Sequence, residues 1–97
     1  MTLQLLLAEI RKLHSKPDLK IQLTWDGGTQ WSAVIPGYLV IDAATKSVTS
    51  GIAMGPTLRS ALDNMIAQLK GRTLQIQNSK DAPFIVPPDL SLGQVEF

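Results

Sequence analysis

Residues 55–71, with the sequence GPTLRSALDNMIAQLKG, contain the clearest structural pattern in the chain. The apolar residues of this segment recur at steps of three and four, and they are Leu58, Ala61, Leu62, Met65, Ile66 and Leu69. This spacing places them on one face of an α-helix. Thr57 is the expected N-cap, and Gly71 suits the left-handed position that follows a helix end. The segment therefore predicts an amphipathic helix with one buried face.

A second amphipathic helix is predicted from Thr2 to His14. Its apolar stripe consists of Leu3, Leu6, Leu7, Ile10 and Leu13. Thr2 is the expected N-cap, and Pro17 ends the helix because the residue before a proline avoids helical backbone angles. We expect His14 to lie on the surface at the end of this helix, where the helix dipole favours a cation.

The residues after the first helix predict a β-hairpin. Apolar and polar residues alternate over 19–25, with Leu19, Ile21, Leu23 and Trp25 on the apolar side. Asp26-Gly27-Gly28 supplies a tight turn into a partner strand over residues 29–35. Pro36-Gly37 is expected to break or bend this strand at an edge or a corner of the sheet.

Residues 38–42 and 47–54 predict a second hairpin, and residues 73–77 a short final strand. The last segment, residues 78–97, is apolar but rich in proline, so we expect it to be extended. The fold class is then α+β, a two-layer sandwich of order α-β-β-β(-β)-α, with both helices on one face of an antiparallel sheet and a more polar opposite face. One domain spans residues 1–77, and the tail packs on this domain or on a partner.

Length and composition limit the class of protein. The 97 residues allow one domain, and the hydrophobic content of 44% is that of a globular chain. The net charge of +1 neither requires nor excludes nucleic acid, and the absence of cysteine excludes disulfides and thiolate metal sites. The apolar start of the chain is interrupted at Glu9, and no stretch approaches the roughly 20 apolar residues of a membrane span. We expect a cytoplasmic protein without a membrane partner.

Few residues are suited to catalysis. His14 is the single histidine, and no serine lies in a nucleophile-elbow context. Asp26 and Asp42 each begin a hairpin loop, where aspartate is a common turn former, and acid–base catalysis would require them to converge in a cleft. Gly55 leads into a helix, but Pro56 replaces the lysine of a phosphate-binding loop, which favours a simple turn over an anion site. We predict a protein that is not an enzyme and holds no cofactor or metal.

Two features favour binding to another protein. The tail contains the apolar residues Phe84, Ile85, Val86, Leu90, Val95 and Phe97, which we predict to contact a partner or a second copy of the chain. An exposed sheet edge near Pro36 is the other candidate contact. Trp25 and Trp31 flank the first turn and form either a cross-strand pair in the core or a stacking surface. The sequence thus predicts a small non-catalytic protein-interaction module.

The order of the elements resembles known small domains. Gly51 and Gly55-Pro56-Thr57, followed by Ala61-Leu62, are similar to the strand-to-helix junction of double-stranded-RNA-binding domains and of HicB-type antitoxins. The resemblance covers about residues 2–70 and implies their topology. Where the RNA-binding family has a lysine cluster, this chain has a single cation, Arg59. In size and element order the chain is also similar to small phage-encoded accessory and inhibitor proteins, including anti-CRISPR proteins.

Nucleic-acid binding, which the RNA-binding resemblance implies, is the alternative function. It would use a basic patch made of Arg11, Lys12, Lys16, Lys20, Arg59, Lys70 and Arg72. Such a patch predicts an affinity that falls as the salt concentration rises. The other interpretation of the same residues is a solvated charged face without a ligand.

Overall fold

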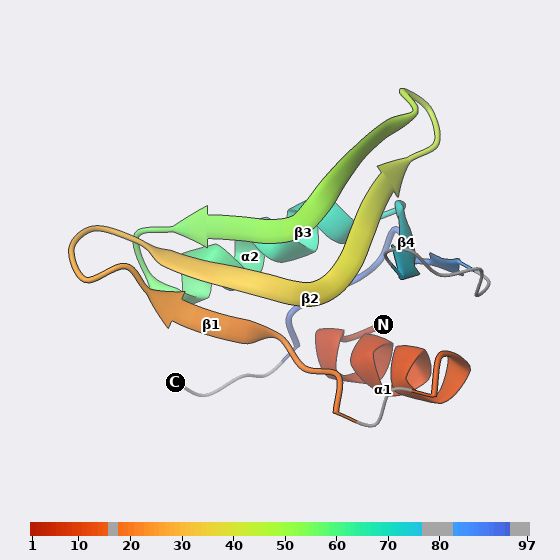
Figure 1. Cartoon of the computed structure of the whole chain (residues 1–97), viewed down its shortest axis with the longest axis horizontal. Helices are drawn as coiled ribbons and strands as arrows, with labels where there is room; N and C mark the ends of the chain where they lie inside the picture. The colour runs from red at the N-terminus through yellow and green to blue at the C-terminus, as the bar shows by residue number, and fades with distance from the viewer. Residues whose placement is uncertain (16–17, 77–82, 94–97) are drawn as a thin grey trace.

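A computed structural model describes residues 1–15, 18–76 and 83–93, and in it two helices lie on one side of a bent antiparallel sheet (Figure 1). The elements follow one another as α1 (Leu3–Leu13), β1 (Gln22–Trp25), β2 (Trp31–Asp42), β3 (Ser47–Gly55), α2 (Leu58–Leu69), β4 (Thr73–Ile76) and β5 (Phe84–Ile85). The predicted α+β fold with an antiparallel sheet is confirmed. In the described ranges, no helix is long and apolar enough to cross a membrane.

The central strand β2 pairs with three other strands of the sheet. One of its edges pairs with β3, while the other pairs with β1 over residues 31–34 and with β4 over residues 38–41. Pro36 and Gly37 lie between these two stretches, where the register shifts and Gly37 adopts a φ of +79°. The predicted bend is confirmed, but the two strands expected on either side of it are one bent strand (Figure 1).

Both helices begin at the predicted caps. The Oγ1 atom of Thr2 accepts a hydrogen bond from the backbone N–H of Leu5, and Thr57 and Ser60 form a reciprocal capping box at the start of α2. Gly71 follows the end of α2 with a φ of +68°. The predicted stripe of α2 is buried except at its first position, and its buried members are Ala61, Leu62, Met65, Ile66 and Leu69. These elements follow their local sequence signals.

The end of α1 differs from the prediction. Leu13, assigned to the apolar stripe, is 52% exposed, whereas His14, expected on the surface, is 7% exposed. His14 is the C-cap of α1, and its ring stacks against Tyr38 of β2. The aromatic ring of Tyr38 and the turn of the chain after α1 therefore bring the histidine into the core in place of the leucine.

The described part of the tail, residues 83–93, belongs to the same core as the rest of the described chain. Strand β5 pairs with β4, and the backbone of Ser91 bonds to Met1 and Leu3 at the start of α1. Val86 is 0% exposed and Leu90 is 1% exposed. These two residues were predicted to contact a partner, and the structure instead buries them against their own chain, where they are out of reach of another molecule.

Candidate interaction surface

The residues considered for catalysis do not converge. Asp26 precedes the first residues of β2 and Asp42 is its last residue, so the length of β2 separates the two carboxyl groups. His14 is buried beside Tyr38. Within the part of the chain that the structure describes, no group of three or more histidine, cysteine or acidic residues could hold a metal ion.

Asp26 organises the loop between β1 and β2. Its Oδ1 atom accepts hydrogen bonds from the backbone N–H groups of Gly28, Thr29 and Gln30 at 2.8, 2.8 and 3.0 Å. These donors, with that of Gln30 the largest contribution, lower the pKa of Asp26 to about 2. The carboxylate is therefore a turn former, in line with the sequence-based interpretation.

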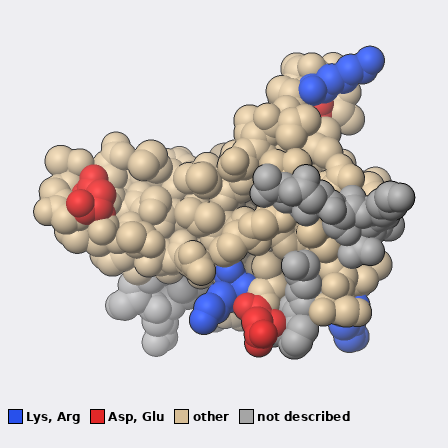
Figure 2. Space-filling model, in the orientation of Figure 1, with Lys and Arg blue, Asp and Glu red and all other residues tan. Residues whose placement is uncertain are grey.

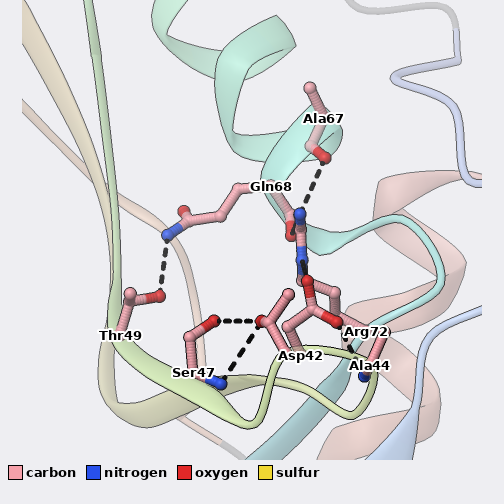
Figure 3. Close-up of polar contacts among 8 residues, drawn as sticks. Asp42, Ala44, Ser47, Thr49, Ala67, Gln68 and Arg72 are labelled. Carbon is pink, nitrogen blue, oxygen red and sulfur yellow. Dashed lines mark hydrogen bonds and ion pairs between the residues drawn. The ribbon is translucent and has the colours of Figure 1, made fainter.

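Asp42 belongs to a polar cluster that joins the β2–β3 hairpin to the end of α2 (Figure 3). The backbone N–H of Ala44 is the main cause of its lowered pKa, and the guanidinium of Arg72, whose Nε lies 3.6 Å from Asp42 Oδ2, contributes as well. Arg72 also donates to the carbonyl oxygens of Ala67 and Gln68. A cavity of about 180 Å³ lies among Val40, Asp42, Ser47, Thr49, Gln68 and Arg72. Because these groups bond mainly to one another, the cluster holds the hairpin against the helix.

The basic residues are divided between structural and exposed positions. Arg11 donates from Nε to the carbonyl of Leu19 at 2.7 Å, and the guanidinium of Arg59 lies 3.9 Å from Asp63. Among the other predicted members of the basic patch, Arg72 is half-buried beside Asp42, whereas Lys12, Lys20 and Lys70 are exposed. Lys16 lies outside the described ranges. On the face shown in Figure 2, lysine and arginine side chains occur in separate places.

The side of the sheet opposite the helices carries no charged residue among its described strand positions. Side chains alternate between the two faces of a strand, and directly paired residues share a face. Burial places Ala33, Val40, Ala53 and Leu74 on the helix side. The remaining positions form what we call the outer face: Gln22, Thr24, Ser32, Val34, Leu39, Ile41, Val48, Ser50, Ile52, Met54, Thr73, Gln75 and Ile85.

Several apolar side chains of the outer face are exposed to solvent. Val48 is 55% exposed, Ile52 47%, Met54 53% and Ile85 74%. Figure 2 shows an uncharged area over β2 and β3, with charged side chains at its ends and along its lower margin. The outer face is more polar than the helix side, as predicted, because hydroxyl and amide side chains occupy positions such as Thr24, Ser50 and Gln75, but the exposure of its apolar residues was not predicted. Exposed apolar side chains gathered on one face of a protein often mark interaction sites.

Close packing of α2 on the end of β3 accounts for the orientation of Ile52 and Met54. Gly51, Ala53 and Gly55 occupy three of the helix-side positions of β3, and Ser47 and Thr49 occupy the other two. A Cβ atom at Gly55 would lie 2.3 Å from Ser60 Oγ and 2.6 Å from the backbone nitrogen of Ala61. Because the start of the helix leaves no room for a side chain at Gly55, the larger residues at this end of the strand occupy the alternating positions that point away from the helix.

The free edge of β3 is partly occupied by side chains of α2. Among the strands that the structure describes, β3 pairs with β2 alone. The Nδ2 atom of Asn64 donates to the carbonyl of Met54 at 2.7 Å, and the Nε2 atom of Gln68 donates to the carbonyl of Ser50 at 3.2 Å. Carbonyl groups engaged in this way are poor partners for a strand of another molecule, so the edge is protected.

Trp25 and Trp31 form the predicted cross-strand pair. They are direct partners in the β1–β2 register, and their ring centroids lie 5.5 Å apart at an interplanar angle of 47°. Of the two interpretations left open by the sequence, a core position does not hold for Trp25, which is 44% exposed, while Trp31 packs partly against the core. Helix α2 packs on β2 and β3, and β1 extends beyond it, so Trp25 and Leu23 remain exposed (Figure 1).

The predicted tail contacts fall into three groups. Val86 and Leu90 lie in the core, and Phe84 packs partly against it. Ile85 projects from the outer face, so it alone among the described members is free to meet a partner. Val95 and Phe97 lie outside the described residues. Sequence reasoning missed the other apolar residues of the outer face, although the alternation of Val48, Ile52 and Met54 with small residues was a usable signal.

No family model matches this sequence, and neither a characterised protein nor a solved structure shows a significant similarity to it.

Proposed function

We propose that this chain is a non-catalytic protein-interaction module that binds a protein partner through the outer face of its sheet. The observation that carries the proposal is a sheet face on which apolar side chains of β3 and β5 are exposed and no described strand position is charged. Removing such a surface from water stabilises a complex by roughly 25 cal/mol per Å² of apolar area. No charge has to be desolvated when a partner covers it.

The chemistry of the outer face favours a protein over a nucleic acid. Its polar positions are hydroxyl and amide side chains, such as Thr24, Ser50 and Gln75, which can form the hydrogen bonds typical of protein interfaces. Phosphate groups need arginine or lysine, and the outer face contains neither. Arg11 and Arg72, two members of the predicted basic patch, bond to carbonyl groups of their own chain.

The proposal is tested by comparing what the tagged full chain and two variants retain from cell extract. Ile52→Glu places a charge in the outer face at a position that is 47% exposed, and Leu5→Glu places the same charge on α1 at a position that is 49% exposed. Both variants should keep the circular dichroism spectrum of the unmodified chain. We expect a stoichiometric partner that is retained by the unmodified chain and by Leu5→Glu and is lost by Ile52→Glu. Equal retention by all three proteins, or retention by none, would overturn the proposal.

A further inference from the structure

Two apolar clusters lie on the outer face, one on each side of the bend in β2. The Ile52 cluster consists of Val34 and its direct partner Ile52, with Met54 two residues further along β3. The Val48 cluster consists of Ile41 and its direct partner Val48, with Ile85 in the same cross-strand row beyond Thr73. Leu39 and Ser50, which are also paired, lie between the clusters.

We propose that the outer face associates with the outer face of a second copy of the chain, with the Ile52 cluster of one copy against the Val48 cluster of the other. The proposal rests on the proposed function and identifies the partner. A two-fold axis near the Leu39–Ser50 pair exchanges the two clusters, so each copy buries both of them in one closed contact. Two antiparallel sheets stacked face to face about 10 Å apart are a common arrangement in proteins.

The charge distribution of the face supports a second copy as the occupant. A surface that carries charge opposes its own copy in many orientations, because like charges meet across the contact. The outer face has no charged side chain at any described strand position, so it is electrostatically compatible with itself. On the side of the molecule shown in Figure 2, the charged side chains of the described residues lie at the ends and the margin.

The hydrogen bonds along β3 favour stacking of faces over pairing of edges. Asn64 and Gln68 occupy carbonyl groups of Met54 and Ser50, which hinders addition of a strand from a second copy. The same two hydrogen bonds leave the side chains of the outer face unobstructed, since α2 lies on the other side of the sheet. A dimer of this chain is therefore expected to use side chains rather than main-chain hydrogen bonds.

The size of the face indicates a reversible dimer. Neighbouring strands lie about 4.8 Å apart, and side chains on one face of a strand recur about every 6.7 Å, so each outward side chain covers about 30 Å² of the sheet plane. The outward side chains of the outer face together cover roughly 400 Å². This is below the roughly 800 Å² per partner of a standard stable interface. We therefore expect dissociation in the micromolar range or above, and the contact becomes visible only in a concentration series.

Sedimentation equilibrium of the purified full chain from about 5 to 500 μM tests the proposal. We expect a monomer–dimer equilibrium that is not weakened between about 50 and 500 mM sodium chloride, because no charges meet in the contact. Ile52→Glu should weaken the dimer at least about tenfold, because a carboxylate would be desolvated without a partner. Leu5→Glu should leave it unchanged. A monomer at every concentration, or a dimer that Ile52→Glu does not weaken, would overturn the proposal.

A mixing experiment tests the exchange of the two clusters. The Ile52→Glu and Val48→Lys variants should each be monomeric alone and should form a heterodimer when mixed. In the proposed arrangement, the carboxylate that Ile52→Glu introduces in one chain lies against the amine that Val48→Lys introduces in the other, and the second pair of clusters stays apolar. Failure of the two variants to associate, while the unmodified chain dimerises, would exclude this arrangement of the copies.

The outcomes separate this inference from the proposed function. If the purified chain stays monomeric and Ile52→Glu still loses a different protein from cell extract, the outer face binds a partner that is not a second copy. If Ile52→Glu changes neither self-association nor retention from extract, the outer face is not the binding surface and both proposals fail.

Discussion

The Nδ1 atom of His14 lies 2.9 Å from the Oη atom of Tyr38, and the two rings stack with their centroids 5.8 Å apart. His14 ends α1, and Tyr38 follows the bend of β2. Both side chains are buried, so the contact fixes the end of the first helix against the central strand. Polar groups at such a depth are costly unless they are hydrogen-bonded.

Tyr38→Phe should reduce the free energy of unfolding by about 1–3 kcal/mol, because it deletes the hydroxyl group beside the buried imidazole. Urea denaturation measures the change. His14→Gln and the double variant complete a double-mutant cycle, in which a coupling free energy of about 0.5 kcal/mol or more is expected. A Tyr38→Phe variant as stable as the unmodified chain would show that the hydrogen bond makes no net contribution.

The contribution of Asp26 to the stability of the folded chain should depend on pH. Three backbone N–H groups lower its pKa from 3.8 to about 2 in the folded chain, so its contribution to stability is complete above about pH 4 and is lost as the pH falls through about 2. The melting temperature of the unmodified chain should exceed that of Asp26→Asn at neutral pH, and this difference should shrink from pH 4 to pH 2. In an NMR titration of the folded chain, a carboxyl midpoint near 3.8 would contradict the prediction.

Gly55→Ala should destabilise the chain, because a Cβ atom at this position would lie 2.6 Å from the backbone nitrogen of Ala61. We expect a loss of about 1–3 kcal/mol, the range for overpacking. Gly28→Ala is the matched control, since its Cβ would meet no atom within 4 Å and its backbone does not have a positive φ. Chemical denaturation of both variants should separate them clearly, and equal stabilities would show that α2 is not packed against β3 as described.

Leu90→Ala should reduce stability by about 2–5 kcal/mol, because its side chain is 1% exposed and its loss leaves a cavity. Ile85→Ala, in the same tail but 74% exposed, should stay within about 0.5 kcal/mol of the unmodified chain. Thermal and urea unfolding measure both. If Leu90→Ala were as stable as Ile85→Ala, the tail would not be part of the core.

Much of the secondary structure could be predicted from local patterns. The caps at Thr2 and Thr57, the turn at Asp26 and the left-handed Gly71 each act through atoms a few residues away, so the sequence contains the whole signal. The bend at Pro36-Gly37 was predictable for the same reason, because proline lacks the N–H group that a ladder needs. The continuity of β2 through the bend was not, because it depends on strands that pair with both of its halves.

The candidate surface was less predictable than the fold. Ile85 was identified from the apolar tail, but Val86 and Leu90 in the same segment are buried. A run of apolar residues in a sequence does not indicate whether those residues pack against their own chain or against another molecule. The outer-face residues Val48 and Ile52 were missed because apolar residues in a strand are usually expected to face the core.

The sequence by itself determined where the helices begin and end, where the chain turns and that the sheet is antiparallel, because those features follow from periodicity, capping and turn chemistry over a few residues. Only the tertiary structure decided which residues of β3 face the helices and which face solvent. At Gly55 of β3, helix α2 lies so close that a Cβ atom would clash with it, and this contact favours the orientation in which Ile52 and Met54 point toward solvent. The same packing of distant segments buried His14 and Leu90, since the free energy of a side chain depends on neighbours that local sequence does not specify.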